Sequence, residues 1–150
     1  MMATVRVQAI VVRGERILMV KHRQNGVEWW CIPGGGLEEG ETSAQGALRE
    51  LMEECNVHGR VLRQTAHLYM PDGNDAISFL VDIGEQEPSL GHDPDVAHGE
   101  DILADVRWLS LREIPERDRI FLWAAGLVGV PGFWAEIELW DNDISYPTSA

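Results

Sequence analysis

One stretch of the chain, residues 34–57, constrains the fold more than any other. It opens with three consecutive glycines, which let the backbone bend tightly, and then has the pattern of a helix. Thr42 suits the helix N-cap, because Gln45 three residues later completes a capping box. We expect the helix to end near Cys55, with Asn56 in the left-handed conformation that often terminates helices.

Three glutamates gather on one face of this expected helix. At about 100° per residue, Glu50, Glu53 and Glu54 fall on one arc and apolar residues on another. Like charges three or four residues apart cost a helix roughly 0.2–0.5 kcal/mol each. The face is either a solvated acidic surface or a cation site, and a hard divalent cation, which prefers oxygen ligands, explains it better. Gly46 lies in the same arc, where it would leave room for an ion or a phosphate.

The stretch resembles the Nudix box, a motif of Gly, five residues, Glu, seven residues, Arg-Glu, an aliphatic residue, any residue, Glu-Glu, any residue, Gly and an aliphatic residue. The matching positions are Gly35, Glu41, Arg49, Glu50, Leu51, Glu53, Glu54 and Val57. A chance match to so many spaced positions is far rarer than for a lone glycine motif. Asn56 replaces the family's Gly, and we expect little effect because Asn tolerates a left-handed backbone best after Gly.

The resemblance implies a hydrolase that cleaves a diphosphate linkage in a nucleoside diphosphate derivative, with Mg²⁺ or Mn²⁺ as cofactor. The substrates it leaves open are a nucleoside triphosphate, ADP-ribose, another nucleotide sugar and a dinucleoside polyphosphate. Glu50 and Glu53 are the candidate catalytic residues on the helix, and which glutamate is the base stays open. The implied metal ligands are Gly34, through its carbonyl, Glu50, Glu53 and Glu54.

Other residues of the site are expected to support these carboxylates. Gly35, Glu41 and Arg49 are interpreted as structural, with a salt bridge between Glu41 and Arg49 that orients the metal ligands. Three glutamates on one helix cover only one side of an ion, so we expect a fourth carboxylate from the acidic loop at 84–101. Glu100 is the first candidate and Asp101 the second, against the alternative of solvated loop carboxylates.

Two residues before the glycines are candidates for binding the substrate. Arg23 follows a short apolar run, and its guanidinium suits phosphate oxygens, although a solvated basic strand end is the alternative. Trp29 and Trp30 are adjacent, so in an extended segment their side chains face opposite ways. We assign Trp30 to the core and Trp29 to substrate binding.

The remaining elements predict one α+β domain over residues 1–150. Short strands and separated helices suit a sheet covered on both faces, and the resemblance implies a Nudix-like α/β/α sandwich with a central mixed β-sheet. The segments at 60–69 and 76–82 predict a hairpin around a Pro-Asp-Gly-Asn turn. Expected strands are residues 5–12, 17–20, 105–109 and 133–140, and expected helical segments are a short turn after Ser110 and residues 118–128.

Charge and composition narrow the partners. A net charge of −13 argues against an extended nucleic-acid footprint, but bound metal ions would still allow a phosphorylated small molecule. No run of apolar residues is long enough for a membrane span, and the N-terminus lacks a signal-peptide pattern. Cys31 and Cys55 predict free thiols in a reducing compartment, so we expect a cytoplasmic protein. The expected late strand leaves a homodimer open.

Two other functional classes stay open. A catalytically silent Nudix-like nucleotide-binding or regulatory module would be expected to have lost some of the motif's carboxylates, and this chain retains them. A structural metal-binding domain would not need three glycines before the helix. The sequence therefore favours an enzyme.

Overall fold

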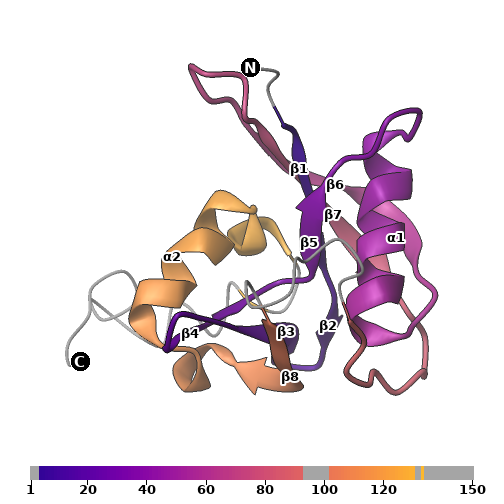
Figure 1. Ribbon diagram of the computed structural model, residues 1–150. Helices are drawn as coiled ribbons and strands as arrows, with labels where there is room; N and C mark the ends of the chain where they lie inside the picture. The colour runs from indigo at the N-terminus through magenta and orange to yellow at the C-terminus, as the bar shows by residue number, and fades with distance from the viewer. Residues whose placement is uncertain (1–3, 93–101, 131–132, 134–150) are drawn as a thin grey trace.

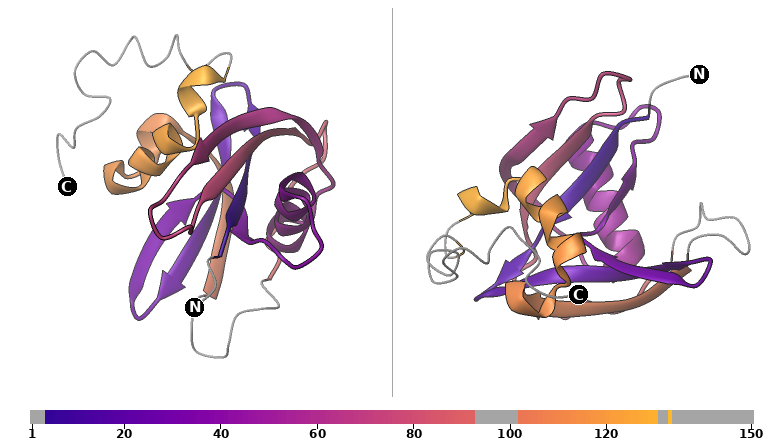
Figure 2. Two further views of the ribbon diagram at one scale, coloured as in Figure 1. Left: turned by 90° about the horizontal axis from the view of Figure 1, so that it is seen from above. Right: turned by 90° about the vertical axis from the view of Figure 1, so that its left-hand side faces the viewer.

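Two β-sheets lie between two α-helices in the part of the chain that the computed structural model describes, which is residues 4–92, 102–130 and 133 (Figure 1). Figure 2 shows the helices on opposite sides of the sheets, which confirms the α/β/α sandwich. The α-helices are α1 (Ser43–Cys55) and α2 (Glu116–Ala124), and two short 3-10 helices are η1 (Leu111–Glu113) and η2 (Leu127–Gly129).

The first sheet is mixed and contains the glycines. Its strands lie in the order β5, β1, β7, β6. Strands β1 and β7 are parallel, β5 is antiparallel to β1, and β6 and β7 form the predicted hairpin. The strands are β1 (Arg6–Ile10), β5 (Gly34–Gly36), β6 (Arg60–Leu68) and β7 (Ala76–Asp82).

The second sheet is antiparallel and is built around β3. Strand β3 pairs with β8 along one side and with β2 and then β4 along the other. Its apolar residues 17–20 are fully buried, as a central strand requires. The predicted strand extends further, to Gln24, because β4 and β8 continue to supply backbone partners. The strands are β2 (Val12–Arg13), β3 (Arg16–Gln24), β4 (Val27–Cys31) and β8 (Ile102–Ser110).

The three glycines form an extended strand, so the predicted tight bend is wrong. Gly34 pairs with Gln8 and Gly36 with Arg6 in the antiparallel ladder between β5 and β1. A Cβ atom added to Gly34 would lie 2.5 Å from the carbonyl oxygen of Val7. Glycine is therefore needed at Gly34 because the neighbouring strand approaches so closely.

Each helix covers its own apolar core. Residues of α1 such as Leu51 and Cys55 pack against Val7 and Val11 on one side of the sheets. Leu122 of α2 packs in a second cluster with Ile17 and residues of other elements. The sheets separate the two clusters, so the two faces of the molecule can carry different chemistry.

One sequence expectation for the second half is wrong, and others fall wholly or mainly on residues outside the described ranges. The helix predicted over 118–128 is interrupted, because Gly126 has a left-handed backbone with φ 89° and α2 ends before it. Phe133 is buried in the core beside α2, while the rest of the strand expected at 133–140 lies outside the described residues. Residues 93–101 of the acidic loop also lie outside them.

Among the described residues, none of the helices has the length and the apolar character of a membrane span.

Candidate active site

Helix α1 has the ends that its sequence predicts. The hydroxyl of Thr42 accepts a hydrogen bond from the Gln45 backbone N–H at 3.1 Å, and the Gln45 side chain accepts one from the Thr42 N–H at 2.9 Å. This is the expected capping box. At the other end Asn56 is left-handed, with φ 57° and ψ 38°, which confirms the predicted helix stop. The helix is thus fixed at both ends by short-range contacts.

Two of the predicted metal ligands are buried against the glycine strand. Glu54 is only 1% exposed, and its Oε1 accepts a hydrogen bond from the Gly34 backbone N–H at 2.9 Å. Glu50 is 4% exposed, and its carboxylate lies over Gly35, where an added Cβ would stand 2.4 Å from Glu50 Oε1. Gly35 therefore makes room for the Glu50 carboxylate, a role that the sequence pattern does not reveal.

Arg49 ties the carboxylates together. Its guanidinium donates to both oxygens of Glu41, at 2.7 and 2.9 Å, which confirms the predicted salt bridge. It also donates to Glu50 at 2.9 Å, to Glu53 at 3.3 Å and to the carbonyl of Gly36 at 2.9 Å. The hydrogen bond from Arg49 holds the pKa of Glu41 below its ordinary value, and the bonds to Glu41 and Glu50 raise the pKa of Arg49.

The third helix carboxylate, Glu53, belongs to the same network but is less buried than Glu50 and Glu54. Its side chain is 21% exposed, and it pairs with Arg49 one turn away. Within the described ranges, no three acidic, histidine or cysteine side chains already converge in a form that could hold a metal ion. Glu50, Glu53 and Glu54 share one helix, but metal binding by them stays a prediction.

Gly46 does not leave space for a ligand, so that interpretation is wrong. A Cβ atom on Gly46 would lie 2.9 Å from Leu37 Cδ1 and 3.0 Å from Val7 Cγ2. The glycine instead lets α1 pack closely on β1 and on the segment after β5. Helical periodicity placed Gly46 near the acidic arc but could not show which protein atoms lie opposite it.

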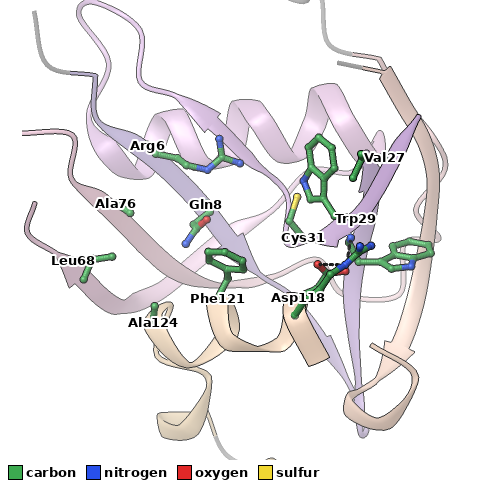
Figure 3. Close-up of a pocket in the computed structure, with 12 residues that line it drawn as sticks. Arg6, Gln8, Val27, Trp29, Cys31, Leu68, Ala76, Asp118, Phe121 and Ala124 are labelled. Atoms are coloured by element: carbon green, nitrogen blue, oxygen red, sulfur yellow. Dashed lines mark hydrogen bonds and ion pairs between the residues drawn. The ribbon is translucent and has the colours of Figure 1, made fainter. Parts of the chain in front are cut away.

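A cavity of about 530 Å³ opens on the α2 side of the molecule (Figure 3). Trp29, a predicted substrate-binding residue, lines it, and the Trp29 ring stacks on the ring of His22 at 5.6 Å. Trp30 also lines it, although Trp30 packs against the α2-side core as well, in keeping with its predicted structural role. The other lining residues are Arg6, Gln8, Val27, Cys31, Leu68, Ala76, Arg117, Asp118, Phe121 and Ala124.

The cavity contains one buried carboxylate and an aromatic rim. Asp118 of α2 is 4% exposed, and its Oδ2 accepts a hydrogen bond from the Trp30 backbone N–H at 3.0 Å. The ring of Phe121 is 67% exposed at the edge of the cavity. Sequence reasoning missed these residues, because the lining comes from β1, β4, β6, β7 and α2 and has no local pattern.

The cavity and the carboxylates lie on opposite faces of the β1–β5 pair. Gly35 pairs with Val7, which packs in the α1-side core, and Gly35 carries the Glu50 carboxylate on that face. The next residues along β1, Arg6 and Gln8, line the cavity on the other face. Strand β5 is at the edge of its sheet among the described strands, so the two regions lie on either side of an edge strand.

One predicted substrate-binding residue, Arg23, is brought to neither region, and two predicted carboxylates lie outside the described residues. Arg23 lies near the end of β3, where its guanidinium binds Glu28 at 2.6 and 2.9 Å, and it does not line the cavity. This pair holds the pKa of Glu28 below its ordinary value. Glu100 and Asp101 lie outside the described residues, so a fourth carboxylate stays a prediction. Neither Cys31 nor Cys55 forms a disulfide in the described structure, and burial raises the pKa of Cys55.

Comparison with known proteins agrees with this geometry. A family model described as NUDIX domain matches residues 2–127. The chain is 29% identical over 105 residues to an NAD-capped RNA hydrolase NudC of Pectobacterium carotovorum, covering 69% of this chain but only 37% of that protein. It is 32% identical over 111 residues to a phosphatase NudJ of Escherichia coli, covering 71% of this chain and 68% of the relative.

Solved structures show the same fold. A NUDIX hydrolase from Nitrosomonas europaea superposes with a TM-score of 0.62 at 24% identity, covering 79% of this chain and 63% of that one. An Ap4A hydrolase from C. elegans gives a TM-score of 0.63 at 17% identity, covering 87% of this chain and 98% of that one. With a family model over most of its length and the motif carboxylates held on the glycine strand, the chain belongs to the NUDIX domain family.

Proposed function

We propose that this chain is a divalent-metal-dependent hydrolase that cleaves a diphosphate linkage in a nucleoside diphosphate derivative. One observation carries the proposal: α1 holds Glu50 and Glu54 as buried carboxylates against the glycine strand, with Glu53 on the same helix. Burying a carboxylate costs free energy, which Arg49 offsets for Glu50 and the Gly34 N–H offsets for Glu54. Charged groups held in this way are concentrated at functional sites, so the arrangement favours a function. The chain spans about a third of the length of the NudC relative, so the activity rests on the site itself.

The residues present fit Mg²⁺ or Mn²⁺. Carboxylate and carbonyl oxygens are the ligands that these hard ions prefer, and Glu50, Glu53, Glu54 and the carbonyl of Gly34 would supply them. The Gly34 N–H fixes the orientation of Glu54, and Arg49 fixes that of Glu50, as residues around metal ligands commonly do. A bound divalent ion would offset phosphate charge and lower the pKa of a bound water.

The protein's own part in the reaction is positioning. Arg49 orients Glu50 and Glu53, and Glu41 in turn holds Arg49 with two hydrogen bonds. Glu50 is our candidate for the base that accepts a proton from the attacking water, with Glu53 beside it. Hydrolysis of a phosphoric anhydride needs little covalent chemistry from the protein, so fixed geometry and charge account for most of the rate.

The cavity on the α2 side supports a nucleotide-type substrate. Trp29 and Phe121 offer aromatic surfaces on which a base can stack, and Asp118 offers an acceptor for its N–H groups. The relatives' names, NAD-capped RNA hydrolase and Ap4A hydrolase, also describe nucleotide derivatives. We infer that the base occupies the cavity while the diphosphate reaches around the edge of β5 to the carboxylates.

A substrate panel tests the proposal. Purified protein with Mg²⁺ or Mn²⁺ would be offered nucleoside triphosphates, ADP-ribose, nucleotide sugars and dinucleoside polyphosphates, with phosphate and nucleotide release as the readout. We expect turnover of at least one class, and loss of turnover in excess chelator. A catalytically silent nucleotide-binding module would bind a panel member without cleaving it, which calorimetry on the same samples would reveal.

Three expectations outside the described structure complete the proposal. Glu100→Gln should lower the turnover rate more than it weakens substrate binding, because a fourth carboxylate acts mainly in the transition state. Normal turnover in a Glu100→Gln, Asp101→Asn double variant would contradict this. A homodimer and a cytoplasmic location are also proposed, and light scattering and fractionation of the source cells test them.

A further inference from the structure

The segment from Ser89 to His92 caps the C-terminal end of α1. The last carbonyls of a helix have no partner within it and need one from elsewhere. Here the N–H of Ser89 donates to the carbonyl of Cys55 at 3.0 Å, that of Gly91 to Glu54 at 2.8 Å, and that of His92 to Glu53 at 3.0 Å. Three consecutive helix carbonyls, two of them on residues of the motif, are thus held by one loop segment.

Asn56 holds this segment in place with its side chain. Its Nδ2 lies 3.0 Å from Ser89 Oγ, 3.3 Å from the Ser89 carbonyl oxygen and 3.3 Å from the Leu90 carbonyl oxygen. The left-handed backbone of Asn56 directs the amide toward the loop at the point where the helix stops. A glycine at this position would keep the backbone conformation but have no amide to donate. Asn56 therefore does more than tolerate the left-handed backbone, because its side chain also binds the Ser89–His92 segment.

Gly91 lets the segment approach the helix closely. A Cβ atom added there would stand 1.9 Å from the carbonyl oxygen of Glu53, a distance at which the backbone would have to move. Gly91 does not have a left-handed backbone, so glycine is needed here because a side chain would not fit. Asn56 and Gly91 thus both support the contact between the Ser89–His92 segment and the end of α1. Asn56 donates hydrogen bonds to the segment, and Gly91 has no side chain to block its approach.

We propose that Asn56 and Gly91 are positioning residues for Glu53 and Glu54. They keep the last turn of α1 from fraying, and that turn sets where the two carboxylates lie. The bond from the Gly34 N–H to Glu54 reports the position of Glu54 directly. The consequence for catalysis rests on the proposed hydrolase function, whereas the effect on Glu54 does not.

Amide hydrogen exchange of Gly91→Ala tests the proposal without any substrate. We expect the added methyl to displace the segment and to speed exchange at the Gly34 amide by about tenfold or more, since a local opening that was rare becomes common. The matched control is Gly129→Ala, because a Cβ at Gly129 meets nothing within 4 Å. That variant should leave exchange at Gly34 unchanged. Faster exchange at Ser89 and His92 with an unchanged Gly34 amide would overturn the proposal.

Kinetics of Asn56→Gly provide the second test. We expect kcat to fall by about threefold or more with KM changed less than twofold, because small misplacement of reacting groups lowers rate steeply. Thr42→Ala is the control, since it weakens α1 at its far end without touching the segment. It should lower the melting temperature and leave kcat within twofold. Equal kcat losses in the two variants would overturn the positioning role. If the wild-type protein cleaves no substrate, the proposed hydrolase function is refuted instead. The exchange rate of the Gly34 amide in Gly91→Ala then tests the positioning role by itself.

Discussion

The two helices face regions of opposite character. On the α1 side, charged groups are joined by short contacts, several of them between residues close in sequence, such as Arg49 with Glu41 and with Glu53. On the α2 side, a cavity is lined largely by apolar and aromatic groups from five elements of the chain. The β1–β5 pair lies between the two regions.

This difference indicates that the α1 side is suited to catalysis and the α2 side to substrate recognition. A region whose carboxylates are fixed by ion pairs and backbone N–H groups is suited to chemistry, because catalysis depends on prearranged charge. A cavity with an aromatic rim is suited to recognition, because stacking supplies binding energy and tolerates varied ligands. Substitutions on the α1 side should therefore change kcat, and substitutions on the α2 side should change KM.

The largest expected effect comes from Gly35→Ala on the α1 side. The new Cβ would lie 2.4 Å from Glu50 Oε1, so the carboxylate must move. We expect kcat to fall about 100-fold, as for an ångström-scale misplacement of a reacting group. Gly36→Ala is the matched control, because its Cβ meets only Thr4 Cγ2 at 3.5 Å, an ordinary contact. Steady-state kinetics of the two variants measure the difference in kcat. Similar kcat values would show that the position of Glu50 does not matter for catalysis.

Phe121→Ala and Trp29→Ala should have a smaller effect, and it should fall on KM rather than on kcat. Each removes an aromatic surface from the cavity, and a stacked base is worth roughly 1–3 kcal/mol by alanine substitution. We expect KM to rise about tenfold with kcat changed less than threefold. Ile120→Ala is the control, since Ile120 is 60% exposed and does not line the cavity. A fall in kcat with KM unchanged would break the proposed division between the two regions.

The smallest effect concerns stability and its pH dependence. Glu41→Gln weakens the two hydrogen bonds from Arg49, and we expect it to cost about 1–2 kcal/mol of unfolding free energy at pH 7. The folded-state pKa of Glu41 is lowered, so its contribution is complete above the ordinary value of 4.5 and is lost as the pH falls below it. Urea unfolding of both proteins at pH 7 and pH 3.5 should show the difference shrinking at low pH. A constant difference would contradict the ion-pair explanation.

The same contrast explains what the sequence could predict. Helix α1, its capping box, its left-handed stop and the Glu41–Arg49 pair were all predicted, because each depends on residues a few positions apart. The hairpin of β6 and β7 was predictable for the same reason. Strand β5 was not, because its conformation depends on β1, which lies some 27 residues earlier in the chain.

The α2 side shows the limit most clearly. Phe121 and Leu68 line one cavity, but nothing in the sequence around either residue points to the other. The docking of Ser89–His92 on the end of α1 was equally hidden, since Asn56 and Gly91 lie more than 30 positions apart and the helix carbonyls are bound by backbone N–H groups. Periodicity finds which face of an element is apolar, whereas tertiary packing decides which polar groups meet across it.

In the proposed reaction, water attacks a phosphoric anhydride at the carboxylates of α1. Hydrolysis in ¹⁸O-labelled water, followed by mass spectrometry of the products, tests it most directly when wild type and Glu54→Gln are compared. We predict one ¹⁸O atom in a phosphate group of the wild-type product, dependence on Mg²⁺ or Mn²⁺, and a rate about 100-fold lower in the folded variant. Unchanged turnover in Glu54→Gln, or full turnover in excess chelator, would contradict the claim.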